Sequence, residues 1–223
     1  ALCGIVIEKA AYRPLRNSPR ISLLISAIGV SFLMENLGLV VFGARPKAFP
    51  QPEVLTKVVK IGGISIVSLS FLIPVVTIVL LVILMYLVNK TTMGMAMRAV
   101  AKDFEAASLM SIDVNKIISL TFAIGSALAA VGGIMWALKF PQINPLMGII
   151  PGLKCFIAAV FGGIGNIPGA VLGGFILGIG EIMIVAFIPS LAGYRDAFAF
   201  IVLIVVLLFR PTGLLGEKIA EKV

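Results

Sequence analysis

The stretch IVSLSFLIPVVTIVLLVILMYLV, residues 66–88, contains no charged side chain. The hydrocarbon core of a bilayer is about 30 Å thick and an α-helix rises about 1.5 Å per residue, so a run of about 20 apolar residues can cross it. This length and apolarity predict a transmembrane helix over Ile66–Val88. The same measure applied along the rest of the chain decides the fold class.

Three further windows meet the same criterion. Ile117–Leu138 is free of charge, whereas Ile21–Phe42 contains Glu35 and Pro168–Ile188 contains Glu181. We therefore predict an all-α fold, a polytopic transmembrane helix bundle.

Shorter apolar segments complete the bundle. Pro151–Gly163, which contains Lys154, is too short to span with ease, and the sequence leaves open whether it crosses the membrane or forms a broken or re-entrant helix. Ala197–Phe209 gains length from residues 194–196. Ala1–Ile7 is expected to be the last turns of a helix that starts before this sequence. The chain is therefore predicted to be an N-terminally truncated piece forming one domain over residues 1–223.

Composition supports a membrane protein over a nucleic-acid-binding one. The chain is 60% apolar and 13% charged, against about 45–50% and about 25% in soluble domains. Its 18 Lys and Arg against 10 Asp and Glu give a net charge of +8. We attribute this excess to cationic loops on the cytoplasmic side rather than to nucleic acid.

The Lys and Arg distribution predicts an orientation. With the segment after Ile7 inside, the inner loops hold eleven of the 18 cations: Lys9, Arg13, Arg16, Arg20, Lys90, Arg98, Lys102, Lys116, Arg210, Lys218 and Lys222. The bias predicts a cytoplasmic C-terminus and a turn at Gly165-Asn166 that approaches the cytoplasm.

Several residue types needed for catalysis are missing. The chain has no histidine, so His-dependent catalysis and His metal sites are excluded. It has no G-x-x-x-x-G-K-[ST] phosphate loop. Cys3 and Cys155 lie far apart in apolar stretches and are interpreted as small apolar residues. We predict no catalytic residue, no metal site and no enzyme.

Acidic residues inside the predicted spans are candidates for the transport pathway. A carboxylate in hydrocarbon costs about 2.5 kcal/mol or more, so Glu35 and Glu181 must face protein or water, or be protonated. One hypothesis places Glu35, its neighbour Asn36 and Glu181 along a pathway. The alternative is a structural hydrogen bond between helices, and the sequence leaves both open.

Small residues at four-residue spacing predict close helix packing. In one predicted span, one helical face carries Gly125, Ala129, Gly133 and Ala137, and in the next it carries Gly165, Gly169 and Gly173. The glycine run around Gly165 lacks a lysine, so tight helix packing is favoured over a phosphate site.

The polar segment 89–116 contains a short amphipathic pattern. Its apolar residues are Phe104, Ala107, Leu109, Met110 and Ile112. They predict either a solvated interfacial helix or a docking element laid into a groove on a soluble partner.

Motifs in this segment resemble a known family. Glu105-Ala106-Ala107 followed by Ser111 resembles the E-A-A-x-x-x-G signature of ABC importer permeases, with Ser in the place of Gly and without the I-x-L-P tail. Matches to the branched-chain amino-acid branch run in order along the chain: Tyr12-Arg13-Pro14-Leu15-Arg16, Ile28-Gly29-Val30-Ser31, Arg98-Ala99-x-Ala101-x-Asp103, Gly152-Leu153-Lys154-x-Phe156, Gly162-Gly163-Ile164-Gly165-Asn166, Leu177-Gly178-x-x-Glu181 and Arg210-Pro211-x-Gly213-Leu214-x-Gly216.

The resemblance implies a permease subunit of an ATP-driven importer of branched-chain amino acids, or of a related small solute such as urea or amides. It implies a coupling loop over residues 89–116, with ATPase-coupling residues Arg98, Asp103, Glu105, Ala106, Ala107 and Ser111. The implied partners are a second permease subunit, two cytoplasmic ATPase subunits, an extracytoplasmic solute-binding protein and the lipid bilayer, without nucleic acid.

Two further expectations follow from the resemblance. This chain would bind no cofactor, because ATP and Mg²⁺ would sit on the ATPase subunits, and it would be a multi-pass protein of the prokaryotic inner membrane. The alternative is a secondary transporter or channel that works without ATPases, and such proteins usually carry more intramembrane charges.

Overall fold

The computed structural model describes residues 1–15, 18–52, 58–61, 64–210 and 212–216. Among the residues used above, Arg16, Pro211, Lys218 and Lys222 lie outside this part of the chain. Contacts divide the chain into two compact units, Ala1–Leu146 and Met147–Val223. We describe each by itself, and the single domain over residues 1–223 stays a prediction.

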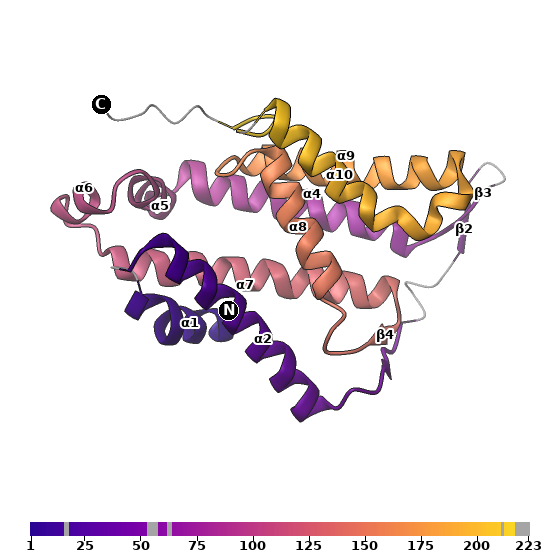
Figure 1. Cartoon of the computed structure of the whole chain (residues 1–223), viewed down its shortest axis with the longest axis horizontal. Coiled ribbons are helices and arrows are strands. Elements are labelled where there is room, and N and C mark those ends of the chain that lie inside the picture. The colour runs from indigo at the N-terminus through magenta and orange to yellow at the C-terminus, as the bar shows by residue number, and fades with distance from the viewer. Residues whose placement is uncertain (16–17, 53–57, 62–63, 211, 217–223) are drawn as a thin grey trace. The chain divides into compact units, whose positions relative to one another are not determined.

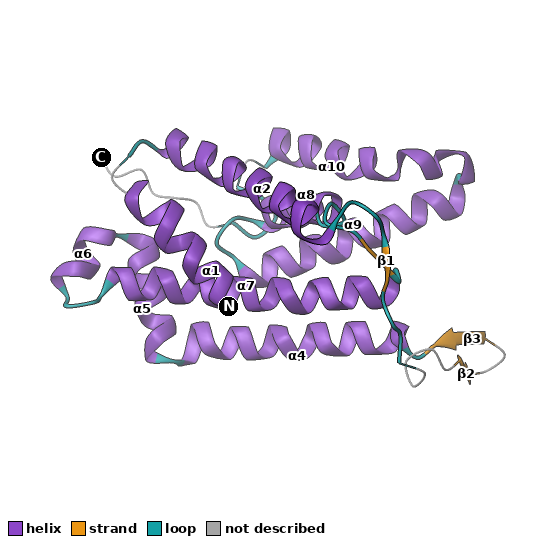
Figure 2. Ribbon diagram, turned by 90° about the horizontal axis from the view of Figure 1, so that it is seen from below, coloured by secondary structure: helices purple, strands orange, loops and turns teal. Residues whose placement is uncertain are grey.

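The first unit is built mainly from helices (Figure 1). They are α1 Leu2–Ile7, the π-helical turn η1 Glu8–Tyr12, the 3-10 turn η2 Arg13–Leu15, α2 Arg20–Phe42, α4 Leu69–Lys90, α5 Thr92–Lys102, α6 Phe104–Leu109 and α7 Val114–Lys139. Both α1 and α4 contact α7. Figures 1 and 2 show α5 and α6 beyond one end of α4 and α7, and short strands at the opposite end.

This unit also contains two pairs of short strands. β1, Lys47–Ala48, pairs antiparallel with β4, Gln142–Ile143, with Lys47 opposite Ile143. β2, Val58–Ile61, and β3, Ile64–Val67, form a second antiparallel pair. The predicted span Ile66–Val88 is therefore shifted, because Ile66 and Val67 belong to β3 and the helix starts at Leu69.

The second unit packs a short helix against two longer ones. Its elements are α8 Ile149–Gly162, α9 Ile167–Phe187, the 3-10 turn η3 Pro189–Tyr194 and α10 Arg195–Phe209. The buried side chains of Ile157, Leu177 and Ala199 form its hydrophobic core, one from each α-helix. α8 contacts both α9 and α10.

The fold prediction of an all-α polytopic bundle is confirmed. Within the described residues, five helices are long and apolar enough to cross a membrane: Ile21–Phe42, Leu69–Lys90, Val114–Lys139, Ile167–Phe187 and Ala192–Phe209. The last is longer than predicted, because the turn η3 continues into α10. α8, with 14 residues, is about 21 Å long and stays below the length of a span.

Large apolar side chains on these helices point outward from the chain. Val40, Leu208 and Phe209 are among the most exposed. In water such surfaces would be unfavourable, whereas lipid or a partner helix covers them without cost.

Candidate functional site

The helix pair α5–α6 is fixed to the end of α4 at a tight corner. Thr91 ends α4 and caps α5, with its Oγ1 accepting from the backbone N–H of Gly94 at 3.0 Å. A Cβ on Gly94 would lie 2.3 Å from the carbonyl oxygens of Leu87 and Val88. Only glycine fits this corner without moving backbone, and the sequence analysis did not single Gly94 out.

Arg98 ties α5 to α4. Its Nη1 donates to the Val88 carbonyl at 2.8 Å and to Asn89 Oδ1 at 3.1 Å. Carbonyls at a helix C-terminus lack intrahelical partners and carry a partial negative charge, so a guanidinium stabilises this end of α4. The structure thus places this predicted coupling residue inside the joint.

Asp103 forms the joint between α5 and α6. Its Oδ1 accepts from the backbone N–H groups of Glu105 and Ala106 at 3.0 and 3.1 Å, which caps α6. Glu105 lies in the first turn of α6 and is exposed, where a negative charge complements the helix dipole. The segment, for which one short helix was predicted, therefore forms two separate, capped helices.

The backbone conformation at Ser111 is one that favours glycine, the residue that the signature usually has at this position. Ser111 has φ +61°, a left-handed conformation, and the backbone N–H of Ile112 donates to Ala107 O while that of Ser111 donates to Ser108 O. This is the Schellman arrangement that ends many helices, and glycine adopts it with the least strain. The chain then turns directly into α7.

The sequence predicted that the apolar residues of this segment form one side of a short helix, and this prediction is wrong. Ala107 is 3% exposed and packs inward, whereas Phe104, Leu109 and Met110 are 59%, 87% and 76% exposed. The reason is that α6 ends at Leu109, so Met110 lies on the turn and Leu109 does not share the helix face of Ala107. The exposed apolar tip of the pair is Phe104, Leu109 and Met110.

Asp113 caps α7 at the far side of this turn. Its Oδ1 accepts from the backbone N–H of Lys116 at 3.1 Å, and the Lys116 ammonium lies 3.1 Å from Oδ2. These bonds, the backbone one first, lower the pKa of Asp113 from its ordinary value. The carboxylate therefore stays ionised at neutral pH, as its capping role requires.

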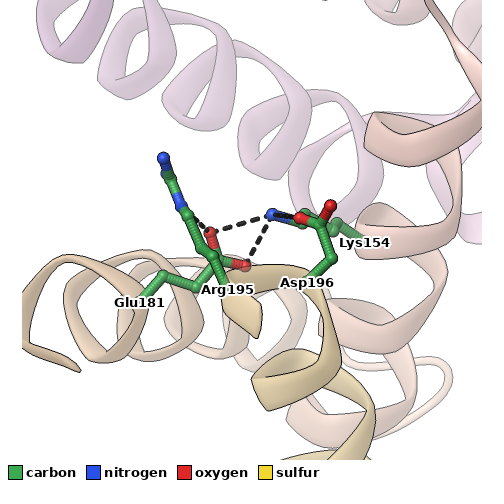
Figure 3. A network of polar contacts seen from close by, with 4 residues as sticks. All are labelled: Lys154, Glu181, Arg195 and Asp196. Atoms are coloured by element: carbon green, nitrogen blue, oxygen red, sulfur yellow. Dashed lines mark hydrogen bonds and ion pairs between the residues drawn. The ribbon is translucent and has the colours of Figure 1, made fainter. Parts of the chain in front are cut away.

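A second cluster joins α8, α9 and α10 (Figure 3). Glu181, 4% exposed, lies 2.8 Å from Lys154 Nζ and 2.9 Å from Arg195 Nε. Lys154 Nζ also contacts Asp196 Oδ1 at 2.7 Å. Sequence analysis identified Glu181 but left Lys154, Arg195 and Asp196 without a role, because the pairing brings together residues from separate helices.

The acidic and amide groups of α2 make local contacts. Glu35 accepts from Ser31 Oγ at 3.1 Å and Asn36 donates to the Phe32 carbonyl at 2.7 Å. Both bonds link residues one helical turn apart on α2, in the first unit, whereas Glu181 belongs to the second unit. The pathway role of all three stays a prediction.

Glycines bring α8 and α9 into backbone contact. A Cβ on Gly169 would lie 2.4 Å from the Gly162 carbonyl oxygen, and one on Gly173 would lie 2.4 Å from the Ala158 carbonyl oxygen. Gly165 has φ +91° and serves the turn between the helices. Among the described residues, no atom outside the local helix backbone lies within 4 Å of a Cβ placed on Gly125 or Gly133, so packing at these two stays a prediction.

The chain beyond α10 closes the α8–α9 turn. The backbone N–H groups of Leu214 and Leu215 donate to the Phe161 and Gly162 carbonyls at 2.9 and 3.0 Å, and Asn166 Nδ2 donates to Leu215 O at 2.9 Å. The unpaired carbonyls at the end of α8 are thus satisfied. Two sequence motifs far apart in the chain form one structural unit.

Glu8 is a buried acid that the sequence analysis assigned to a loop. Its side chain is 0% exposed and accepts from Ser119 Oγ of α7 at 2.6 Å. It lies in the π-helical turn η1, and such turns are not readable from hydropathy. Among the described residues no group could hold a metal ion, and Cys3 and Cys155 are exposed free thiols.

The chain is similar to known transport proteins. Residues 1–207 match the family described as "Branched-chain amino acid transport system / permease component". The high-affinity branched-chain amino acid transport system permease protein BraD of Pseudomonas aeruginosa is 43% identical over 99% of this chain and 72% of its own length. Permease protein LivH of the same kind of system in Escherichia coli is 43% identical over 99% of this chain and 72% of LivH.

More distant similarity extends to archaea. A probable branched-chain amino acid transport permease protein LivH of Methanocaldococcus jannaschii is 31% identical over 88% of this chain and 56% of its own length. No solved structure matches the chain significantly.

Proposed function

The chain belongs to the branched-chain amino acid transport permease family, and on that premise we propose that it forms half of the translocation pathway of an ATP-driven importer. Its cargo is a branched-chain amino acid, as the names of its relatives state for those proteins. Related small solutes such as urea or amides are the alternative cargo. The location is the prokaryotic inner membrane.

The observation that carries the proposal is the joint between α5 and α6. Arg98, Asp103 and the Ser111 turn hold this helix pair through hydrogen bonds to backbone groups of neighbouring residues. Its tip exposes the apolar side chains of Phe104, Leu109 and Met110. A rigid helix pair with an apolar tip can lie in a groove of a soluble partner and transmit that partner's movement to α4 and α7.

The partners of this proposal come from the family to which the chain belongs. Two cytoplasmic ATPase subunits bind and hydrolyse ATP with Mg²⁺, and one of them grips the tip of α5–α6. A second permease subunit completes the pathway, and an extracytoplasmic solute-binding protein delivers the solute. ATP binding closes the ATPases and the α5–α6 movement opens the bundle outward, which is alternating access. This chain holds no cofactor of its own and performs no chemical step.

A secondary transporter or channel is the rival function, and copurification separates the two. The full chain, expressed with the genes adjacent to its own and purified through a tag, should retain two P-loop ATPases in detergent. Purified chain without ATPases, together with solute flux that continues without ATP, would contradict the proposal. The control variant Leu109→Met keeps an apolar side chain at the tip, and it should retain the ATPases as well as the wild-type chain does.

A further inference from the structure

The ion-pair network of α8–α10 has a buried half and an exposed half. Glu181 and Lys154 form the buried half, with side chains 5% and 27% exposed. Arg195 and Asp196 form the exposed half, with side chains 51% and 54% exposed. Two ion pairs connect the halves. Arg195 Nε lies 2.9 Å from Glu181 Oε2, and Asp196 Oδ1 lies 2.7 Å from Lys154 Nζ.

The exposed half keeps unused bonding capacity within the described residues. Arg195 contacts Glu181 through Nε, which leaves the two Nη groups of its fork as donors. Asp196 contacts Lys154 through Oδ1, which leaves Oδ2 as an acceptor. Figure 3 shows the guanidinium end of Arg195 pointing away from Glu181. A guanidinium fork suits a carboxylate, and a free carboxylate oxygen suits an ammonium.

The charge of the network selects the kind of ligand. Lys154 and Arg195 balance Glu181 and Asp196, so the cluster as a whole is neutral. A ligand with a net charge would leave one unmatched charge at the membrane, whereas a zwitterion adds one charge of each sign. Half-exposed charges also cannot face hydrocarbon at acceptable cost, so Arg195 and Asp196 face water, headgroups or protein.

We propose that Arg195 and Asp196 bind the zwitterionic headgroup of a free amino acid, with the α-carboxylate on Arg195 and the α-ammonium on Asp196. The choice of an amino acid rests on the proposed function. The site lies where α9 ends and α10 begins, at the end of the second unit opposite the α8–α9 turn. The predicted orientation puts this end outside, so the solute meets the site before it crosses.

Direct binding to the assembled permease–ATPase complex tests the site. The complex, held in lipid nanodiscs without the solute-binding protein, is incubated with radiolabelled leucine. We expect saturable binding that excess isoleucine displaces. Isoamylamine, which lacks the carboxylate, and isocaproate, which lacks the ammonium, should fail to displace it at the same concentration.

The variants remove one feature each and leave the buried half intact. Arg195→Lys keeps a cation for Glu181 but loses the fork, and Asp196→Asn keeps an acceptor for Lys154 but loses the charge. Each should weaken leucine binding about tenfold, the effect of losing one charge-assisted contact. The exposed loop cation Arg45 provides the control, and Arg45→Lys should bind as wild type does.

The outcomes separate this site from the proposed function. If the wild-type complex with its solute-binding protein takes up leucine but the nanodiscs bind none, or if both variants bind as wild type does, the site is overturned and the importer stands. Displacement by isoamylamine or isocaproate as strong as by isoleucine also overturns the site. If the wild-type complex takes up no branched-chain amino acid, the proposed function itself fails.

Discussion

Ser111 holds a backbone conformation that usually belongs to glycine, with φ +61°. The sequence shows that this position departs from the family signature. It does not show the backbone conformation there, because a left-handed φ cannot be read from composition. The structure shows this conformation together with the two backbone bonds that end α6. A left-handed φ costs a non-glycine residue about 1–2 kcal/mol.

Replacing Ser111 with glycine should therefore stabilise the turn. Glycine removes the strain but adds freedom to the unfolded chain, so the expected net gain is about 0.5–1 kcal/mol. Amide hydrogen exchange over residues 107–112 measures it, and Ser111→Gly should slow exchange there. Ser108→Gly, inside α6, should speed exchange, and faster exchange in Ser111→Gly would contradict the account.

Glu181 could be identified from the sequence, but its ion-pair partners could not. The cost of an intramembrane carboxylate singled it out from the sequence. Its partners Lys154 and Arg195 could not be predicted, because the pairing depends on how α8, α9 and α10 pack. The structure makes Glu181 a contact between helices, which was one of the two alternatives left open.

Removing Lys154 should destabilise the second unit. Lys154→Met leaves buried Glu181 with Arg195 alone, and breaking such a pair costs up to about 3 kcal/mol. The double variant Lys154→Met with Glu181→Met should regain most of this loss, since no buried charge is then uncompensated. Thermal unfolding of the purified protein measures both, and a double variant less stable than the single one would contradict the pairing.

At the scale of elements, the sequence predicted close helix packing better than it predicted helix ends. The spacing of glycines indicated the packing, whereas hydropathy did not locate the ends. Gly169 and Gly173 lie against the backbone of α8 as four-residue spacing suggests. The division of segment 89–116 into α5 and α6 was not predicted. It depends on the caps Thr91 and Asp103, and hydropathy alone does not register caps of short helices.

Adding one methyl group should destabilise the protein at a glycine of α9 that packs against α8, but not at a glycine of α9 with open space around it. Gly173→Ala places a Cβ 2.4 Å from the Ala158 carbonyl oxygen, and such overpacking costs about 1–3 kcal/mol. Gly178→Ala is the control, because no described atom lies within 4 Å of its Cβ position. The midpoint of thermal aggregation in detergent should fall for Gly173→Ala only. Equal midpoints for the two variants would contradict close packing of α8 on α9.

At the scale of the whole molecule, the sequence predicted a multi-pass bundle, and the part of the chain that the structure describes confirms it with five helices of spanning length. The sixth, α8, stays short as predicted. The orientation stays a prediction from the Lys and Arg bias, which favours a cytoplasmic α5–α6 pair and an extracytoplasmic β1–β4 pair.

Cysteine labelling from either side of the membrane tests the orientation. In a variant with Cys3→Ser and Cys155→Ser, the exposed positions Ser108 of α6 and Lys47 of β1 are replaced one at a time. Ser108→Cys should react with a membrane-impermeant maleimide only in inside-out vesicles, and Lys47→Cys only in right-side-out vesicles. The reverse pattern would invert the predicted topology.

The central claim is that ATPase subunits drive this chain through the tip of α5–α6. Leucine uptake into proteoliposomes of the assembled importer, with ATP on the ATPase side, tests it most directly. Leu109 is 87% exposed, so Leu109→Asp should leave folding intact while removing an apolar contact with the ATPase. We predict that Leu109→Asp lowers ATP-driven uptake at least about tenfold and that Leu109→Met keeps it. Uptake by Leu109→Asp at the wild-type rate, or uptake by wild type without ATP, would contradict the claim.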